Sequence, residues 1–546
     1  MVYRSNARAA SAALTLMFLV SAISGCGSSS NSSDAAPTPP TTSTATPAPT
    51  PAPTPAPTPA PTPAPPATSP TASTLVTASN TGDACLPVAI PSATTLFNSP
   101  KRVFAHYFNP YPISIDNAAS ANDYYNRNYL SKTGESGKWA AQGGFLRQRP
   151  MGVAVNAKTT WRQLNMQQEV SAAIARGITG FTFDSMSATD ATDSNSALHL
   201  MLAAAHAVDS RFKIVVMPDI TALGSDSNAV VEIIAAAAAS PAAYRLSDGR
   251  LVVSAFDAGL NPASWWLSVI SRLTAQGIHI AFVPTFLGWS ATADAFAPFS
   301  YGFGDWGSAT VGNASAQLGD PEIVHKTYGK IFMMPVDGQQ YRPKDSVYWE
   351  AGNSGAFRDA WNSSIQGNAD WIQLVTWNDF TETSAIAPTT DATLQRTIGT
   401  GLYNLTGYYA TWFLSGQQPQ ITHDVLYYFY RREATTAASP AQTDRVTLVT
   451  GAAQNSIELL AFLKSPGVLK ITVGGKTYTQ NAAAGVVSFK VPSQAGTPLF
   501  TLSRSGADVF SFHGGVPIYG SGGLPSGLQD LTYWNGSASK TGVCSL

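Results

Sequence analysis

Short apolar runs alternate with longer amphipathic stretches between about residues 101 and 415. Apolar runs of this length, bounded by polar breaks, are typical of buried parallel strands. The runs are 102–108, 177–184, 212–219, 250–257, 278–284, 299–304, 330–336 and 371–378. The stretches that predict helices are 161–176, 194–209, 225–240, 262–276, 289–297, 318–327, 354–368 and 393–413. Eight strand-then-helix units predict an α/β fold, a (β/α)8 TIM barrel, which we place within residues 84–417.

The pattern changes after residue 417. Shorter segments rich in β-branched residues follow, several with alternating polar and apolar positions, and Gly, Pro and Asn mark the gaps between them. They are 425–431, 445–450, 456–463, 468–473, 485–490 and 497–503. This pattern is typical of a β-sandwich. We therefore expect an accessory β-sandwich domain over residues 418–546, with no specific motif for sugar binding.

The charge balance narrows the range of partners. The chain has 546 residues, 44% of them apolar and 12% charged, with 32 basic and 33 acidic side chains. This balance shows no basic footprint for nucleic acid. Twelve Trp, 20 Tyr and 24 Phe suit either core packing or stacking on sugar rings. We expect a monomer with no nucleic-acid partner.

The N-terminus has the organisation of an export signal. Residues 1–26 carry a basic start and a short apolar stretch, Ala12 to Val20, which is too short to span a bilayer. The end, Ile23-Ser24-Gly25-Cys26, resembles a bacterial lipobox, so Cys26 is the expected lipidation site. The protein would then be an exported lipoprotein, anchored to a membrane and facing the periplasm or the cell surface. Ordinary secretion with cleavage nearby is the alternative.

Residues 27–83 form a linker rich in Pro, Thr and Ala. Such a tract lacks the large apolar side chains of a core and favours extended polyproline II. The remaining cysteines, Cys85 and Cys544, flank the folded part. In an oxidising compartment they predict a disulfide; two free thiols are the alternative.

Acidic residues follow most of the predicted strands, at the end of a barrel where active sites lie. They are Asp184, Asp219, Asp257, Asp305, Asp337, Asp379 and Glu382. Helix caps account for part of such a set, but the remainder would line one acidic substrate-binding cleft. His106 in the first strand is either a substrate hydrogen-bonder or a core histidine. Trp306 and Trp377 suit either sugar stacking or packing, and we expect the long 109–160 loop to form a wall of the cleft.

Asp379 and Glu382 are the candidate catalytic residues. They come just after the apolar run 371–375, with aromatic residues beside them. Glycosidic bond cleavage needs one group to protonate the leaving oxygen and a second to activate water or attack the sugar. A helix cap beside a solvated turn would give the same local pattern. Acid–base hydrolysis needs no cofactor or metal, and we expect none.

Segments from Val103 to about Arg431 resemble glycoside hydrolase family 71, the α-1,3-glucanases or mutanases. The most specific is Thr376-Trp377-Asn378-Asp379-Phe380-Thr381-Glu382-Thr383, similar to the family's WND(F/Y)GES. Further matches are Val103 to Tyr107, Gly180 to Asp184, Met217 to Asp219, Ser254 to Asp257, Asp305-Trp306, Met333 to Pro335, Pro419 to Asp424 and Tyr428 to Arg431. Thr381 and Thr383 replace the usual Gly and Ser, and Asp257 stands where Glu is more frequent.

The resemblance implies endo-hydrolysis of α-1,3-glucan with inversion at the anomeric carbon. The family's two acids correspond to Asp379 and Glu382, and we assign Glu382 as general acid and Asp379 as the base that directs water. Two alternatives stay open. The same barrel would act on another α-glycan such as α-mannan, or the chain would be a non-catalytic glycan-binding lipoprotein.

Overall fold

The computed structural model describes residues 75, 79–80, 82–391, 397–437 and 440–544. The predicted signal segment with Cys26 and nearly all of the predicted linker lie outside these residues. Eight parallel strands close into a barrel in the order β12-β2-β4-β5-β6-β7-β8-β9. Their bounds are β2 Arg102–Tyr107, β4 Gly180–Ser185, β5 Lys213–Pro218, β6 Leu251–Ala255, β7 Ile280–Phe286, β8 Gly302–Asp305, β9 Ile331–Asp337 and β12 Trp371–Val375. The predicted α/β barrel is confirmed.

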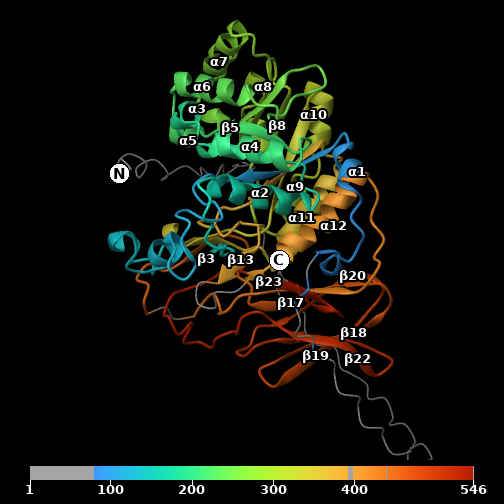
Figure 1. The fold of residues 1–546 in the computed structure, drawn as a ribbon. Helices are drawn as coiled ribbons and strands as arrows, with labels where there is room; N and C mark the ends of the chain where they lie inside the picture. Colours follow the sequence, from blue (N-terminus) through green and yellow to red (C-terminus); the bar gives the residue numbers. More distant parts are fainter. Residues whose placement is uncertain (1–74, 76–78, 81, 392–396, 438–439, 545–546) are drawn as a thin grey trace, which may run out of the picture. The chain divides into compact units, whose positions relative to one another are not determined.

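Helices follow the strands and lie outside the barrel (Figure 1). They are α2 Trp161–Ile174, α4 Ala197–Val208, α6 Ser227–Ala238, α7 Ala263–Ala275, α8 Ala293–Phe296, α10 Asp320–Tyr328, α11 Gly355–Gln366 and α12 Gly401–Ser415. Shorter helices are α1 Ala93–Phe97, α3 Thr189–Thr192, α5 Ile220–Leu223 and α9 Asn313–Ala316. Side-chain caps fix several starts: Ser196 accepts from the amide of His199 before α4, and Asp226 caps α6. The outward side chains of the strands and the inner faces of the helices share one large apolar core.

The last barrel helix starts later than predicted. The pattern predicted a helix over 393–413, whereas α12 begins at Gly401. Thr397–Gly399 instead forms strand β14, which pairs with β13 (Thr389–Asp391), and β13 pairs with β3 (Gln148–Pro150). The cause is long-range pairing with the loop after β2. Residues 392–396 lie outside the described part of the chain.

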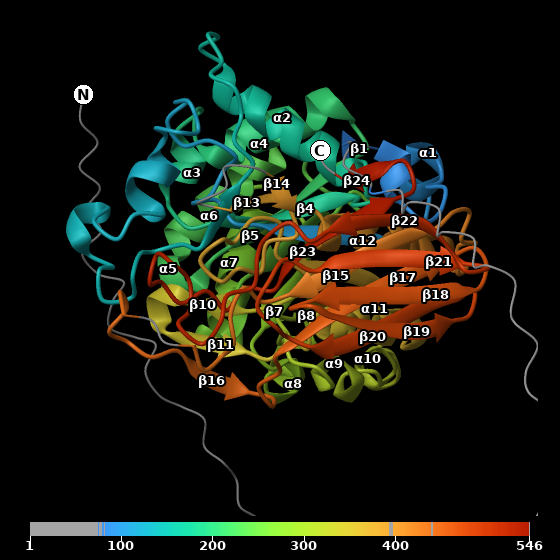
Figure 2. The ribbon, with the colours of Figure 1, turned by 90° about the horizontal axis from the view of Figure 1, so that it is seen from below.

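The C-terminal part contains two sheets, ordered β1-β24-β23-β15-β17-β20 and β19-β18-β21-β22 (Figure 2). The bounds are β1 Ser79–Asn80, β15 Val425–Tyr430, β17 Ser456–Leu463, β18 Gly467–Val473, β19 Lys476–Ala482, β20 Gly485–Pro492, β21 Leu499–Arg504, β22 Ala507–His513, β23 Trp534–Ser539 and β24 Gly542–Cys544. They share an apolar core, in which Tyr428 of the first sheet stacks on Phe500 of the second with ring centroids 5.4 Å apart. Strand-rich C-terminal sheets are confirmed.

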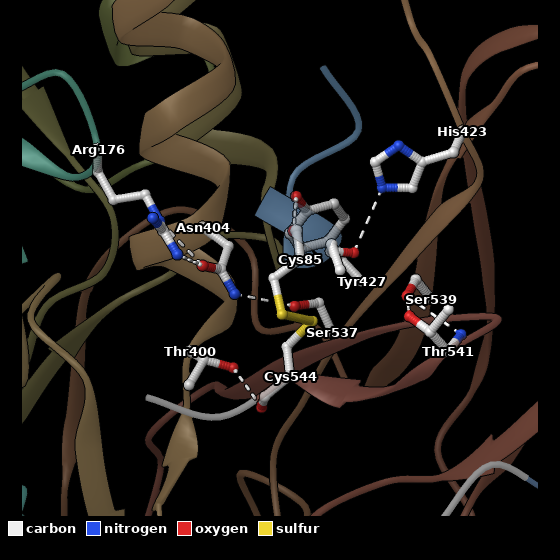
Figure 3. Close-up of a disulfide and its surroundings, with 11 residues drawn as sticks. Cys85, Arg176, Thr400, Asn404, His423, Tyr427, Ser537, Ser539, Thr541 and Cys544 are labelled. Carbon is white, nitrogen blue, oxygen red and sulfur yellow. Dashed lines mark hydrogen bonds between the residues drawn. A yellow bond between two sulfur atoms is a disulfide. The ribbon is translucent and has the colours of Figure 1, made fainter. Parts of the chain in front are cut away.

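A disulfide joins Cys85 to Cys544, as expected, with the two Cα atoms 5.6 Å apart (Figure 3). It links residues 459 positions apart in the sequence. Nearby, Asn404 of α12 accepts from Arg176 and donates to the hydroxyl of Ser537 in β23. The last barrel helix, the C-terminal sheet and the start of the folded chain therefore meet at one place.

Candidate active site

Asp379 lies in a tight turn directly after β12. Its Oδ1 accepts hydrogen bonds from the Thr381 amide at 2.8 Å, the Thr381 hydroxyl at 2.5 Å and the Glu382 amide at 3.2 Å. The Asp379 amide donates to the hydroxyl of Thr376 at 2.7 Å. An Asp that binds the amides of the next residues locks its own turn. Among the described residues, each of these acceptor contacts uses Oδ1, which leaves Oδ2 for other chemistry.

Glu382 is held by two side chains from the segment that follows β9. Arg342 Nη2 lies 2.8 Å from Glu382 Oε1, and Gln340 Nε2 donates to Oε2 at 2.9 Å. Arg342 in turn lies over the ring of Trp349. Arg342 and Gln340 therefore fix the positions of both carboxylate oxygens of Glu382.

The environment of Asp379 favours its protonated form. Burial raises the pKa of Asp379 to about 6, and the negative charge of Glu382 adds to the rise. The hydrogen bond from Thr381 and the charges of Lys344 and Arg342 oppose it. Two neighbouring carboxyls with different surroundings are the usual basis for a division into acid and base.

A third carboxyl lies beside this pair. Asp337 is the last residue of β9 and is buried. Burial raises the pKa of Asp337 well above its usual range, and the charge of Glu382 raises it further. Burial and the nearby carboxylate thus both disfavour a third negative charge next to the pair.

A second polar group lies at the ends of β2, β4 and β5. His106 Nε2 and Asp184 Oδ2 are 3.8 Å apart, and both side chains are buried. His106 Nδ1 and Asp184 Oδ1 have no partner within the described chain. Burial, followed by the charge of Asp184, raises the pKa of Asp219 to about 6. Asp219 also caps α5 through the amides of Thr221 and Ala222.

Aromatic side chains cover this second group. Trp306 is half-buried and meets the ring of His106 edge-on, with centroids 4.8 Å apart. Phe256 contacts Trp306 at 4.6 Å. The adjacent Asp257 is half-buried with a left-handed φ of 47°, an uncommon conformation for a residue other than glycine. The structure therefore brings His106, Asp184, Asp219 and Trp306 together, with Asp257 beside them.

Trp377 and Asp305 were also predicted to contact the substrate. Trp377 is 1% exposed and packs in the main core against Phe181 and Tyr403, so its predicted role in sugar stacking was wrong. Stacking requires an open ring face, and this ring has none. Asp305 accepts from the amide of Gly288 and from Gln317 Nε2, contacts that join neighbouring loops. A direct role of Asp305 in sugar binding stays a prediction.

The long loop after β2 packs against the turn that carries Asp379 and Glu382. Asn378 exchanges hydrogen bonds with the backbone of Phe108 at 2.7 and 3.0 Å and donates to the carbonyl of Tyr111 at 2.7 Å. Tyr111 also packs with Phe380 in a small apolar cluster. Asn378 therefore ties the first strand to the end of the eighth.

The side chains that hold Glu382 were not predicted from the sequence. Gln340 and Arg342 belong to a short β-hairpin formed by β10 (Tyr341–Arg342) and β11 (Val347–Trp349). A weak signal exists in the sequence, because two short runs with aromatic residues flank the turn-forming Pro343 to Ser346. Within the described ranges, no three His, Cys, Asp or Glu side chains are grouped as a metal site.

Two hollows of about 320 and 460 Å³ lie at the opposite, N-terminal ends of the strands. Arg102 and Lys213 line the first, and Arg250 and Lys330 line the second. Neither includes a residue of the carboxylate pair. The chemistry of the barrel is therefore best placed at the carboxyl ends of the strands, as is general for this fold.

Comparison with known proteins gives a family match. The model of glycosyl hydrolase family 71 matches residues 153–545. The chain is 26% identical over 370 residues to the glucan endo-1,3-alpha-glucosidase agn1 of Schizosaccharomyces pombe, covering 64% of this chain and 85% of the relative. An ascus wall endo-1,3-alpha-glucanase from the same organism is 24% identical over 409 residues, covering 68% of this chain and 92% of the relative. A GH99 endo-alpha-mannosidase structure from Bacteroides thetaiotaomicron is 17% identical with a TM-score of 0.43, covering 57% of this chain and 97% of that one.

Proposed function

Because the chain belongs to glycosyl hydrolase family 71 and is therefore a glycosidase, we propose that it hydrolyses α-1,3-glucan internally, using Asp379 and Glu382. The observation that carries the proposal is the pair itself: two carboxyls at one strand end, one buried and one paired with a guanidinium. Support for the substrate comes from the relatives, whose names specify endo-1,3-α-glucanase activity.

The surroundings of the two carboxyls favour a definite division of roles. Asp379, with a pKa of about 6, carries the proton that the leaving oxygen receives. Glu382, ion-paired to Arg342, is the base that draws a proton from the attacking water. This assignment reverses the one made from the sequence, because burial and charge partners are properties of the folded chain. Protonation of the departing sugar's oxygen, with attack by water from the opposite face, inverts the anomeric centre.

His106, Asp184, Asp219, Asp257 and Trp306 are the proposed substrate contacts. Asp184 and His106 each have a polar atom without a protein partner, which suits hydrogen bonding to sugar hydroxyls. Trp306 is half-buried and lies against His106. A partly open aromatic face beside polar groups is the arrangement that sugar rings stack on.

The proposed location follows from the N-terminal sequence. Export and lipidation at Cys26 would tether the enzyme to a membrane through the 27–83 linker, so that it meets a polymer outside the cytoplasm. Mass spectrometry of the N-terminal peptide from the membrane fraction tests this; an unlipidated peptide that begins elsewhere contradicts it. Among the described helices, none has the length and apolar character needed to cross a bilayer.

The decisive test is product release from insoluble α-1,3-glucan by the parent and by Asp379→Asn and Glu382→Gln. We expect the parent to release oligosaccharides and both variants to lose at least about a hundredfold in rate, since each removes a group that acts in the transition state. Proton NMR of the first product gives the anomeric configuration, and a β-anomer establishes inversion. A parent active only on another α-glycan, for example α-mannan, would overturn the substrate class.

A further inference from the structure

Residues 339–342 form an extended strip with two different faces. Gln340 and Arg342 point their side chains at Glu382, at 2.9 and 2.8 Å. The side chains of the alternate residues, Gln339 and Tyr341, contact the C-terminal part of the chain, while the Tyr341 amide donates to the Glu382 carbonyl at 2.8 Å and to the Thr383 hydroxyl at 3.1 Å. Side chains of an extended segment alternate between two faces, so one short strip joins a proposed catalytic carboxylate to a distant segment.

The segment on the other side of the strip is 529–533, just before β23. The Tyr341 hydroxyl donates to the carbonyl of Gln529 at 2.7 Å. Gln339 Oε1 accepts from the amide of Tyr533 at 2.8 Å, and Gln339 Nε2 donates to the Tyr533 carbonyl at 3.4 Å. All of these groups are buried. These contacts leave the strip little freedom to move away from 529–533.

Segment 529–533 is itself firmly held. Arg147 from the long loop donates to the Gln529 carbonyl at 2.6 Å, and Arg431 at the end of β15 donates to the Leu531 carbonyl at 2.8 Å. The Asp530 amide donates to Glu433 at 2.6 Å. The segment is therefore a fixed support connected to the C-terminal sheets and to the loop after β2.

The hairpin that continues the strip is tied to the same part of the chain. Its strand β11 pairs in parallel with β16 (Thr447–Thr450), as Figure 2 shows. Directly after β11, buried Glu350 forms an ion pair with Arg431 at 3.0 Å. Both ends of the hairpin are thus anchored outside the barrel.

We propose that Gln339 and Tyr341 are positioning residues, which attach the strip to segment 529–533 and thereby hold Gln340 and Arg342 against Glu382. The C-terminal sheets then complete the active site of the barrel, beyond any accessory role. The proposal rests on the proposed function of Glu382. Gln339 and Tyr341 themselves touch neither the substrate nor the reacting atoms.

Tyr341→Phe tests the proposal, because it removes one hydroxyl and keeps the ring. Tyr430→Phe is the matched control: Tyr430 is equally buried, and its hydroxyl donates to a carbonyl, that of Val516, within the C-terminal sheets. We expect kcat on α-1,3-glucan to fall roughly five- to tenfold in Tyr341→Phe with KM within about twofold, and kcat of the control to stay near the parent value. Gln339→Leu should behave as Tyr341→Phe does.

The split between kcat and KM separates positioning from simple stabilisation. Looser contact of Arg342 and Gln340 with Glu382 should lower kcat in Tyr341→Phe only, with KM nearly unchanged. An unchanged kcat in Tyr341→Phe, with parent activity intact, would overturn the proposal.

Hydrogen–deuterium exchange without substrate gives a readout that does not depend on the reaction. We expect faster exchange of the amides in 339–342 and 380–383 in Tyr341→Phe than in Tyr430→Phe. Equal exchange in the two variants would refute the positioning role. A parent that cleaves no α-1,3-glucan would refute the proposed function instead, and the exchange result would still decide whether Tyr341 holds the strip.

Discussion

The hydroxyl of Thr381 should set the charge state of Asp379. Thr381 Oγ1 donates to Asp379 Oδ1 at 2.5 Å, and both residues are buried. Thr381→Val removes this donor with almost no change of shape. The two amide donors to the same oxygen, from Thr381 and Glu382, remain, so the turn should keep its conformation.

The size of the effect follows from the kind of hydrogen bond. A hydrogen bond to a charged group contributes about 1.5–3 kcal/mol, and about 1.4 kcal/mol corresponds to a factor of ten in an equilibrium constant. Loss of the hydroxyl favours protonated Asp379 and raises its pKa. The pH limb that reports Asp379 should therefore move upward by about one pH unit or more.

The assay is kcat against pH on α-1,3-glucan. If Asp379 is the proton donor, the enzyme works below its pKa, and Thr381→Val extends activity toward alkaline pH while the acidic limb stays in place. Thr381→Ser keeps the hydroxyl and should follow the parent. Thr411→Val is a control for the loss of a buried hydroxyl, since Thr411 Oγ1 has no partner within the described chain.

Two results would refute this reasoning. Unchanged limbs in Thr381→Val would mean that the hydroxyl does not influence Asp379 during turnover. Movement of the acidic limb instead would make Asp379 the base and restore the roles assigned from the sequence.

Three further substitutions test buried carboxyl groups. Glu350→Ala removes the carboxylate that forms the ion pair with the Arg431 guanidinium. Urea titration should show a free energy of unfolding lower by about 3–5 kcal/mol. A loss below about 1 kcal/mol would show that the ion pair between Glu350 and Arg431 contributes little to stability. Burial raises the pKa of Glu169 to about 8. The folded parent therefore binds a proton that the unfolded chain releases, and its stability should fall as pH rises from 5 to 8, whereas that of Glu169→Gln should not. The same dependence of melting temperature on pH in both proteins would disprove this. Burial raises the pKa of Asp337, so Asp337→Asn, which removes the ionisable group and keeps its shape, should keep kcat near the parent value. A hundredfold loss would give Asp337 a catalytic role.

The sequence alone was enough to predict the barrel strands and the acids that follow them. Buried parallel strands are continuous apolar runs, and that signal is local, so all eight strands and the position of Asp379 and Glu382 could be found without tertiary information. The cysteine pairing was also predictable, because Cys85 and Cys544 are the two cysteines that flank the folded part. Strand β23 was not predicted, because its sequence, Trp-Asn-Gly-Ser-Ala-Ser, has no apolar run or alternation. It is a buried strand because it pairs with β15, about one hundred residues earlier in the chain.

The contacts and burial of the site residues depended on the tertiary structure. Strands β10 and β11 have two and three residues, and β11 pairs with a strand about one hundred positions away, so no local pattern predicts that Arg342 meets Glu382. The ring of Trp377 could face sugar or core, and only packing placed it in the core. A carboxyl's proton affinity is set by burial and by nearby charges, neither of which spacing along the chain reveals. The sequence therefore determined which acids are present, and the fold determined how deeply each is buried and which charges lie beside it.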